Sequence, residues 1–329
     1  MHPFTYTRAT DEAGAVSSGS AATTSFLAGG TTLVDLMRLE VMRPSAVVDL
    51  GGLALAQIEE SSDGSVKIGA LVTNSALAYH AAIVKGFPVL SQAILAGASP
   101  QVRNVATTGG NLLQRTRCPY FRDPQITSCN KRAPGSGCAA IGGVTRSHAV
   151  LGTSDKCIAT HPSDMAVALV ALDAVVHVRG AHGTRTIAVS ELHELPGQHP
   201  EKETVLAPGE LITHVELPAT PFAKTSRYVK VRDRASFAFA LASAAVAVQL
   251  EGTAIGTVRI ALGGVGTKPW RAREAEEMLV GKQRDRTLFT AAARRALVSA
   301  TPQEGNKFKI ELAQRTIVRA LEEVTGGGA

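Results

Sequence analysis

The segment "FLAGGTTLVDLM", residues 26–37, carries a glycine pair between a short apolar run and a stretch with helical spacing of apolar residues. Gly29 and Gly30 can adopt positive φ without steric cost. Successive backbone N–H groups in such a turn converge on an anion, and the hydroxyls of Thr31 and Thr32 are further donors. The segment therefore predicts a strand, a turn that could bind a phosphate, and a helix whose N-terminus favours the same phosphate.

A second glycine pair occurs in "TTGGN", residues 107–111, also predicted at the end of a strand. Neither pair has the G-x-G-x-x-G spacing of a dinucleotide-binding turn or the sequence of a P-loop. A single Gly-Gly is more often a plain tight turn. Two pairs that both carry hydroxyl side chains strengthen the phosphate-binding interpretation without deciding it.

Four cysteines lie between residues 118 and 157, and the chain has no others: Cys118, Cys129, Cys138 and Cys157. The surrounding segment, about residues 115–160, is rich in Pro, Gly, Arg and Ser and lacks apolar periodicity, which predicts a long loop or insertion. The spacing contains no C-x₂₋₄-C pair of the kind that structural zinc favours. Disulfides would need an oxidising compartment. Zinc, with His148 or His161 as further ligands, and unpaired thiols remain alternatives to an iron–sulfur cluster.

The pattern of helices and strands predicts an α+β fold with two domains, divided near Thr220 into residues 1–220 and 221–329. "HPSDMAVALVALDA", residues 161–174, is predicted as a helix that begins at Pro162, Ser163 and Asp164. We find no Ser/His/Asp or Cys/His arrangement with supporting context, so no catalytic residue is predicted.

The net charge of +6 fits an anionic cofactor or an acidic partner. No row of aromatic residues alternates with Lys and Arg, which argues against a nucleic-acid partner. The longest apolar stretch, residues 235–250, is too short for a membrane span and is expected to be a core element. The N-terminal residues lack a basic region followed by an apolar run, so we expect no signal peptide on this chain.

Five segments together resemble the FAD-binding medium subunit of the xanthine dehydrogenase and carbon monoxide dehydrogenase family of molybdenum hydroxylases. They cover nearly the whole chain in the order expected for that family, and they are "FLAGGTTLVDLM", "RNVATTGGNLLQ", "HPSDMAVALVALDA", "YVKVRDRASFAFA" and "ALGGVGTKPWRAREAE". Within the family, the chain is most similar to the FAD subunit of bacterial heterotrimeric aldehyde oxidoreductases of the periplasmic type.

This resemblance implies a vanillyl-alcohol-oxidase (PCMH) type FAD-binding fold, followed by a smaller C-terminal α+β domain of the CO dehydrogenase flavoprotein type. We expect this FAD to be bound non-covalently, because neither glycine loop contains a His or Cys that could form a bond to the flavin. A first group of residues would wrap the pyrophosphate, and a second group would contact the flavin or approach it from the second domain. The first group is Phe26, Leu27, Ala28, Gly29, Gly30, Thr31, Thr32, Leu33 and Val34, and the second is Thr107, Thr108, Gly110, Asn111, Asp164, Ile212 and Lys230. Asp164 could instead be only a helix cap, and Lys230 only a solvated strand residue.

The same resemblance implies a function for the cysteines. Most members of the family place the "SD" helix soon after the "GGN" loop, whereas here about fifty residues separate Asn111 from Asp164. A minority of members, which includes the corresponding subunit of hydroxybenzoyl-CoA reductase, carry an insertion there that holds a 4Fe–4S cluster. Four thiolates saturate such a cluster, so the resemblance implies Cys118, Cys129, Cys138 and Cys157 as its ligands.

The implied function is that of a flavin relay in a heterotrimer. A large molybdopterin subunit would oxidise an aldehyde, a small subunit with two 2Fe–2S clusters would pass electrons on, and FAD in this chain would deliver them to an external acceptor. The complex would be periplasmic by co-export with a signal-bearing partner, or cytoplasmic. The alternative is an assembly subunit that is stabilised by zinc or by an iron–sulfur cluster and has no flavin redox function.

Overall fold

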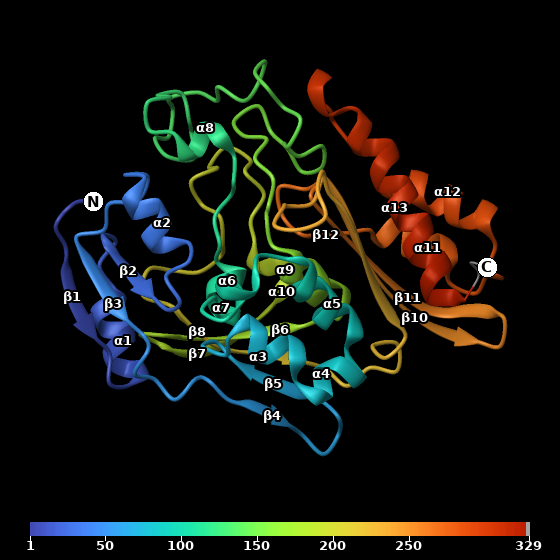
Figure 1. The fold of residues 1–329 in the computed structure, drawn as a ribbon, viewed down its shortest axis with the longest axis horizontal. Helices are drawn as coiled ribbons and strands as arrows, with labels where there is room; N and C mark the ends of the chain where they lie inside the picture. The colour runs from blue at the N-terminus through green and yellow to red at the C-terminus, as the bar shows by residue number, and fades with distance from the viewer. Residues whose placement is uncertain (327–329) are drawn as a thin grey trace.

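The fold, in a computed structural model that describes residues 1–326, consists of three β-sheets with helices packed on and between them (Figure 1). The last three residues of the predicted C-terminal domain lie outside the described residues. The α+β fold class is confirmed. The first two sheets and their helices come from the N-terminal two thirds of the chain, and the third sheet comes from the remainder.

The first sheet is parallel, with the strand order β1-β3-β2. Its strands are β1 (Thr5–Arg8), β2 (Thr24–Leu27) and β3 (Ala46–Asp49), and its connections contain α1 (Glu12–Gly19) and α2 (Leu33–Arg38). The side chain of Asp11 accepts a hydrogen bond from the Gly14 N–H, which caps α1. The predicted strand, glycine turn and helix of residues 26–37 are therefore β2, its following loop and α2.

The second sheet is antiparallel, with the order β4-β5-β8-β6-β7. Its strands are β4 (Ile58–Glu60), β5 (Val66–Gly69), β6 (Val175–Gly180), β7 (Gly183–Ala188) and β8 (Leu211–Leu217). Alternate residues such as Val176, Val178 and Val215 are buried on one face. That face packs on helices α3 (Asn74–Tyr79), α4 (Ala81–Gly86), α5 (Pro88–Ala96) and α9 (Asp164–Ala171).

The third sheet is antiparallel, with the order β12-β11-β10-β9. Its strands are β9 (Ser226–Val231), β10 (Ala242–Glu251), β11 (Ala254–Gly263) and β12 (Trp270–Arg271). Helices α11 (Arg273–Leu279), α12 (Arg286–Ala296) and α13 (Phe308–Thr325) cover its outer side, at the right of Figure 1. Helices α5 and α9 contact β9, β10 and β11, so that the third sheet shares its packing with the helices of the second.

Four further short helices and one 3₁₀ turn lie in the connections: α6 (Pro100–Arg103), α7 (Thr108–Leu112), α8 (Pro119–Arg122), α10 (Val189–Leu192) and the turn Glu304–Asn306. Within the described chain, no helix is both long enough and apolar enough to cross a membrane.

The cysteine segment lies outside the three sheets, at the top of Figure 1. Between α8 and α9 it has turns and isolated bridges, one of which pairs Cys129 with Cys138, but within the described residues it has no helix or strand. It packs on α2, because Phe121 and Cys129 form an apolar cluster with Leu36. The predicted long loop is thus held against the helix that follows the first glycine pair.

Candidate cofactor-binding site

A cavity of about 250 Å³ lies between the first and second sheets. Ten of the residues predicted to bind the cofactor line it, from the loop after β2, from the second glycine segment and from β8. They are Phe26, Ala28, Gly29, Gly30, Thr31, Thr32, Leu33, Thr107, Gly110 and Ile212. The two glycine segments, which are about eighty residues apart in the sequence, therefore face one ligand site.

The first glycine loop has positive φ at Gly30 but not at Gly29, so the backbone prediction holds for one of the two glycines. Gly30 has a φ of 69°, in the left-handed region that glycine tolerates best. A Cβ on Gly29 would lie 2.0 Å from the carbonyl oxygen of Val105, so this residue has no room for a side chain. The side chain of Thr32, at the N-cap of α2, makes no capping hydrogen bond to the described residues. Its hydroxyl is therefore available to a bound anion.

The second glycine segment differs from the prediction of a turn at a strand end. It forms the short helix α7, which follows α6, and Thr107 caps α7 by accepting a hydrogen bond from the Gly110 N–H. Gly109 and Gly110 do not have positive φ. Small size is the reason for glycine here, because a Cβ on Gly109 would lie 3.1 Å from the Ala70 Cβ. The prediction that this glycine pair forms a turn with positive φ is therefore wrong.

The other predicted residues do not line this cavity: Leu27, Val34, Thr108, Asn111, Asp164 and Lys230. Thr108 is fully buried and donates a hydrogen bond to the Val72 carbonyl oxygen. The Asn111 Oδ1 accepts a hydrogen bond from the Ser163 hydroxyl at 2.6 Å, which ties α7 to the start of α9. Thr108 and Asn111 therefore hold α7 in place through these hydrogen bonds, without lining the cavity themselves.

Asp164 and Lys230 form a buried ion pair with an Oδ2–Nζ distance of 2.7 Å, and their side chains are 9% and 4% exposed. The Tyr228 hydroxyl donates a hydrogen bond to Asp164 Oδ1 at 2.6 Å, and burial raises the pKa of Tyr228 well above its usual range. Asp164 also lines a second cavity, of about 240 Å³, between the cysteine segment and the third sheet. The ion pair thus links Lys230, on β9, to Asp164, which lines this second cavity.

Replacing Lys230 with methionine should lower the free energy of unfolding by about 3 kcal/mol, because it leaves the Asp164 carboxylate buried without its cation. Tyr228→Phe removes only one hydrogen bond to the same carboxylate and should cost less, about 1.5 kcal/mol. Urea unfolding of the two variants and the parent chain measures both values. Equal stability of the Lys230→Met variant and the parent would show that the pair is not formed in solution.

A smaller cavity lies between the glycine-loop cavity and the cysteine segment. A cavity of about 40 Å³ shares Leu113 with the glycine-loop cavity and shares Thr116, Thr160 and His161 with the cavity beside Asp164. Cys157 lines this small cavity, and Cys118 lines the one beside Asp164. Neighbouring cavities thus share lining residues from the glycine loops to the thiols.

The four thiols surround one further cavity, which all of the cysteines line. All four are free cysteines, without disulfide bonds. Burial, reinforced by neighbouring thiols, raises the pKa of Cys118 to about 12, and burial also raises the pKa of Cys157. A metal that bound here would therefore have to displace protons from the thiols.

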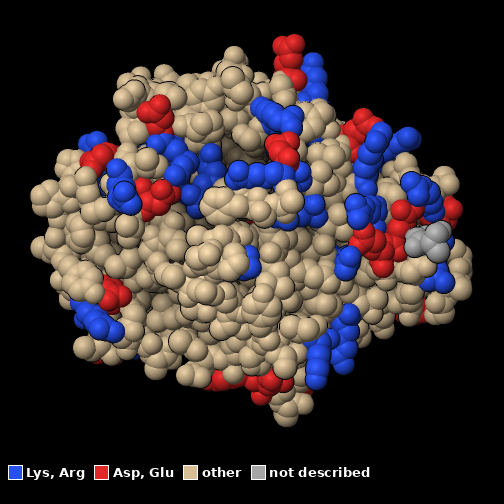
Figure 2. Space-filling model, in the orientation of Figure 1, with Lys and Arg blue, Asp and Glu red and all other residues tan. Residues whose placement is uncertain are grey.

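Positive charge surrounds the thiols. Figure 2 shows Lys and Arg side chains gathered along the edge of a hollow in this part of the surface. Lys131 pairs with Glu203 at 2.9 Å, and Arg115 pairs with the same carboxylate. Arg117 and Arg122 both contact Asp35 of α2. These cations would offset the negative charge of a thiolate-ligated cluster, and Arg117 and Arg122 also tie the segment to α2.

The C-terminal domain holds the cysteine segment through His148. The His148 Nε2 lies 3.1 Å from Cys118 Sγ. The His148 carbonyl oxygen accepts hydrogen bonds from the Nζ of Lys309 at 3.0 Å and from Asn306. Lys309 is fully buried, and burial lowers its pKa to about 7.

Ten residues that line the glycine-loop cavity were not predicted to bind the cofactor: Ser25, Met42, Leu50, Ala70, Leu71, Gly109, Leu113, Arg115, Glu210 and Leu211. Most are apolar residues from segments that are far apart in the sequence. No local sequence pattern marks such residues as cofactor ligands. Arg115, as a cation next to the second glycine segment, could have been suspected as a partner for a phosphate.

The chain belongs to the family of FAD-binding subunits of molybdenum hydroxylases, and it is an oxidoreductase subunit. The model of the "FAD binding domain in molybdopterin dehydrogenase" matches residues 2–220, and the model of the "CO dehydrogenase flavoprotein C-terminal domain" matches residues 227–324. The division of the chain near Thr220 itself remains a prediction.

Among individual relatives, the chain is 49% identical over 325 residues to the aldehyde oxidoreductase FAD-binding subunit PaoB of Escherichia coli, and the match covers 98% of each chain. It is 27% identical to the glyceraldehyde dehydrogenase medium chain of Sulfolobus acidocaldarius, over 91% of this chain and 89% of that one. In structure it is similar to carbon monoxide dehydrogenase of Hydrogenophaga pseudoflava. That match has a TM-score of 0.77 and 23% identity, and it covers 100% of this chain and 99% of the other.

Proposed function

We propose that this chain is the electron-transfer subunit of a three-subunit molybdenum aldehyde oxidoreductase, and that it holds FAD and an additional 4Fe–4S cluster. When bound, these groups supply the electron transfer, and the chain supplies binding, orientation and charge. The observations that carry the proposal are one cavity lined by both glycine segments and a separate cavity lined by all four thiols.

The glycine-loop cavity fits FAD in its chemistry. Backbone N–H groups, the hydroxyls of Thr31 and Thr32 and the Arg115 guanidinium suit the pyrophosphate. Apolar side chains such as Leu50 and Ile212 line the same cavity and suit the less polar parts of the molecule. The remaining predicted residues, including Asp164 and Lys230, are proposed to act at the edge of the bound FAD.

The thiols fit a cluster better than a single zinc ion. Each Zn–S bond is about 2.3 Å long, so tetrahedral zinc holds its sulfurs about 3.8 Å apart. Among the described residues, no three of the thiols have sulfur atoms that all lie within 4.8 Å of one another. A four-iron cluster accepts sulfurs that are farther apart, with one thiolate on each iron.

The proposed partners are a large molybdopterin subunit, which oxidises the aldehyde, and a small subunit with two 2Fe–2S clusters. Two observations support them: the 49% identity with a subunit whose name specifies an aldehyde oxidoreductase, and the 27% identity with a chain named as the medium chain of a glyceraldehyde dehydrogenase. Electrons would leave through FAD to an external acceptor. We place the complex in the periplasm, by co-export with a signal-bearing partner, or in the cytoplasm.

The purified complex is expected to show flavin absorption near 370 and 450 nm, roughly the values of the free cofactor, and aldehyde should bleach these bands. The chain expressed without its partners should retain FAD but fail to respond to aldehyde, because aldehyde oxidation is proposed to take place in the large subunit. Absorbance before and after aldehyde measures both. A complex that oxidises aldehyde but lacks flavin bands would favour the assembly-subunit alternative.

A further inference from the structure

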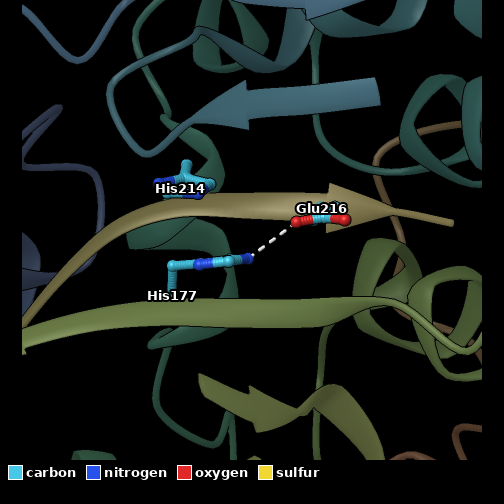
Figure 3. Close-up of side chains that lie close together, drawn as sticks. All are labelled: His177, His214 and Glu216. Carbon is cyan, nitrogen blue, oxygen red and sulfur yellow. Dashed lines mark hydrogen bonds and ion pairs between the residues drawn. The ribbon is translucent and has the colours of Figure 1, made fainter. Parts of the chain in front are cut away.

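Three potential metal ligands lie together on the second sheet, on the face opposite its buried valines (Figure 3). His177 is on β6, and His214 and Glu216 are on the neighbouring strand β8. His177 and His214 are direct cross-strand partners, and Glu216 is two residues along β8, so that all three side chains project from the same face. None of them lines the cavities described above.

The three side chains offer ligand atoms at short mutual distances. One ring nitrogen from each histidine and one carboxylate oxygen all lie within 4.8 Å of one another. The two imidazole rings are stacked, with centroids 3.9 Å apart and an angle of 18° between their planes. The His177 Nε2 lies 2.9 Å from a Glu216 carboxylate oxygen. Ligands of one tetrahedral ion lie about 3.4 Å apart, and each imidazole binds an ion in its own ring plane, so binding needs an approach on the order of 1 Å and a rotation of at least one ring out of the stack.

The hydrogen bonds around His214 determine which of its nitrogens carries the lone pair. The Thr213 hydroxyl donates its hydrogen to the His177 carbonyl oxygen at 3.2 Å. Its oxygen therefore accepts from the His214 Nδ1, which lies 3.1 Å away and must carry the proton in the neutral ring. The His214 Nε2 then has a free lone pair, and among the described residues this buried atom has no hydrogen-bond partner.

The hydrogen bond from His214 to Thr213 is of the kind that fixes the tautomer of a metal ligand, although the stacked rings must still turn to bind one ion. A histidine that binds a metal usually donates its other N–H to a neighbouring acceptor, as His214 does to Thr213. Between His177 and Glu216, a cation would replace the shared proton. The side chains of His177 and Glu216 are 25% and 32% exposed, so an ion can reach them from solvent.

Among the described residues, no lysine or arginine forms an ion pair with the Glu216 carboxylate. Lys67 of β5 is the cross-strand partner of Glu216, but within the described chain no ion pair joins the two. Glu59 of β4 is in turn the cross-strand partner of Lys67 and contributes a second negative charge near this face.

We propose that His177, His214 and Glu216 bind a divalent transition-metal ion, and that this ion cross-links β6 and β8. Two imidazole nitrogens and one carboxylate oxygen favour Zn²⁺, Ni²⁺ or Cu²⁺ over Mg²⁺ or Ca²⁺. The remaining coordination position faces solvent and accepts water. This site is separate from the thiols and does not depend on the proposed electron transfer.

Cu²⁺ is a suitable probe, because its electron paramagnetic resonance spectrum resolves coupling to imidazole nitrogen. The oxidised complex, cleared of loosely bound metal with a chelator, is titrated with Cu²⁺ up to one ion per chain. We expect a tetragonal Cu²⁺ signal with coupling to two nitrogens. The same preparation should bind Zn²⁺ in equilibrium dialysis, and the Zn²⁺ should compete with the Cu²⁺.

The variant His214→Ala should lose the two-nitrogen coupling and bind Zn²⁺ at this site about tenfold more weakly or worse. The matched control is His182→Ala, since His182 is exposed in the turn between β6 and β7. The control should behave like the parent chain. FAD content, measured in parallel, shows whether each variant is folded. If His214→Ala retains FAD and gives the same Cu²⁺ signal and Zn²⁺ stoichiometry as His182→Ala, the proposal is wrong.

Discussion

Substitution of alanine for Gly29 is expected to remove most of the FAD from the protein. The added Cβ would lie 2.0 Å from the Val105 carbonyl oxygen, a backbone atom that cannot move without moving the segment before the second glycine pair. Either that segment or the first glycine loop must be displaced, and both line the cavity. A loss of about 3 kcal/mol of binding free energy weakens FAD affinity more than a hundredfold. The measurement is flavin released by denaturation, per chain.

Gly86→Ala is the matched control, because a Cβ at this position, the last residue of α4, meets nothing within 4 Å. This control should retain full FAD. Gly30→Val tests the same loop by conformation, since a β-branched residue at a φ of 69° is strained, and it should also lose FAD. Full FAD occupancy in both Gly29→Ala and Gly30→Val would disprove the assignment of this loop to FAD binding.

Replacing any one of the four cysteines with serine is expected to lower the iron content of the complex by about four atoms, together with about four sulfides. All four thiolates would ligate one cluster, so each substitution should remove the same spectroscopic signal. We also expect partial loss of FAD. The structure gives a route for this effect, because Cys129 and Phe121 pack on Leu36 of α2, next to the first glycine loop.

Ser128→Ala is a suitable control for the cysteine variants. Ser128 lines the same cavity as the thiols but offers no sulfur, so its loss should leave the iron and sulfide contents unchanged. Zinc is measured in the same samples. One zinc per chain without additional sulfide in the parent protein would replace the cluster with a structural zinc site.

Local sequence patterns predicted the parts of the site that depend on local chemistry. Gly30 was predicted to have positive φ, and it does. The helix that begins at Asp164 and the cysteine loop were also predicted within a few residues. In each case the signal was a residue type whose backbone or capping preference acts over a few positions.

Other parts could not be predicted, because they depend on which strands become neighbours. Leu50 and Leu71 reach the cavity only because the first sheet packs against the second. The cross-strand pairing of His177 with His214 depends on the register of β6 and β8, including an irregularity beside His177. Helix α1 contains Ala, Ser and Gly with little amphipathic pattern, so periodicity gave no indication of it.

The contact between Lys309 and the His148 carbonyl oxygen joins residues that are 161 positions apart. During synthesis, the thiols leave the ribosome long before the helix that carries Lys309 has been made. Until then, the loop that carries Cys118 and His148 lacks this one attachment to the C-terminal domain. We therefore expect iron and sulfide to be inserted after translation is complete, and a chain truncated before α13 to remain without them even where the insertion machinery is abundant.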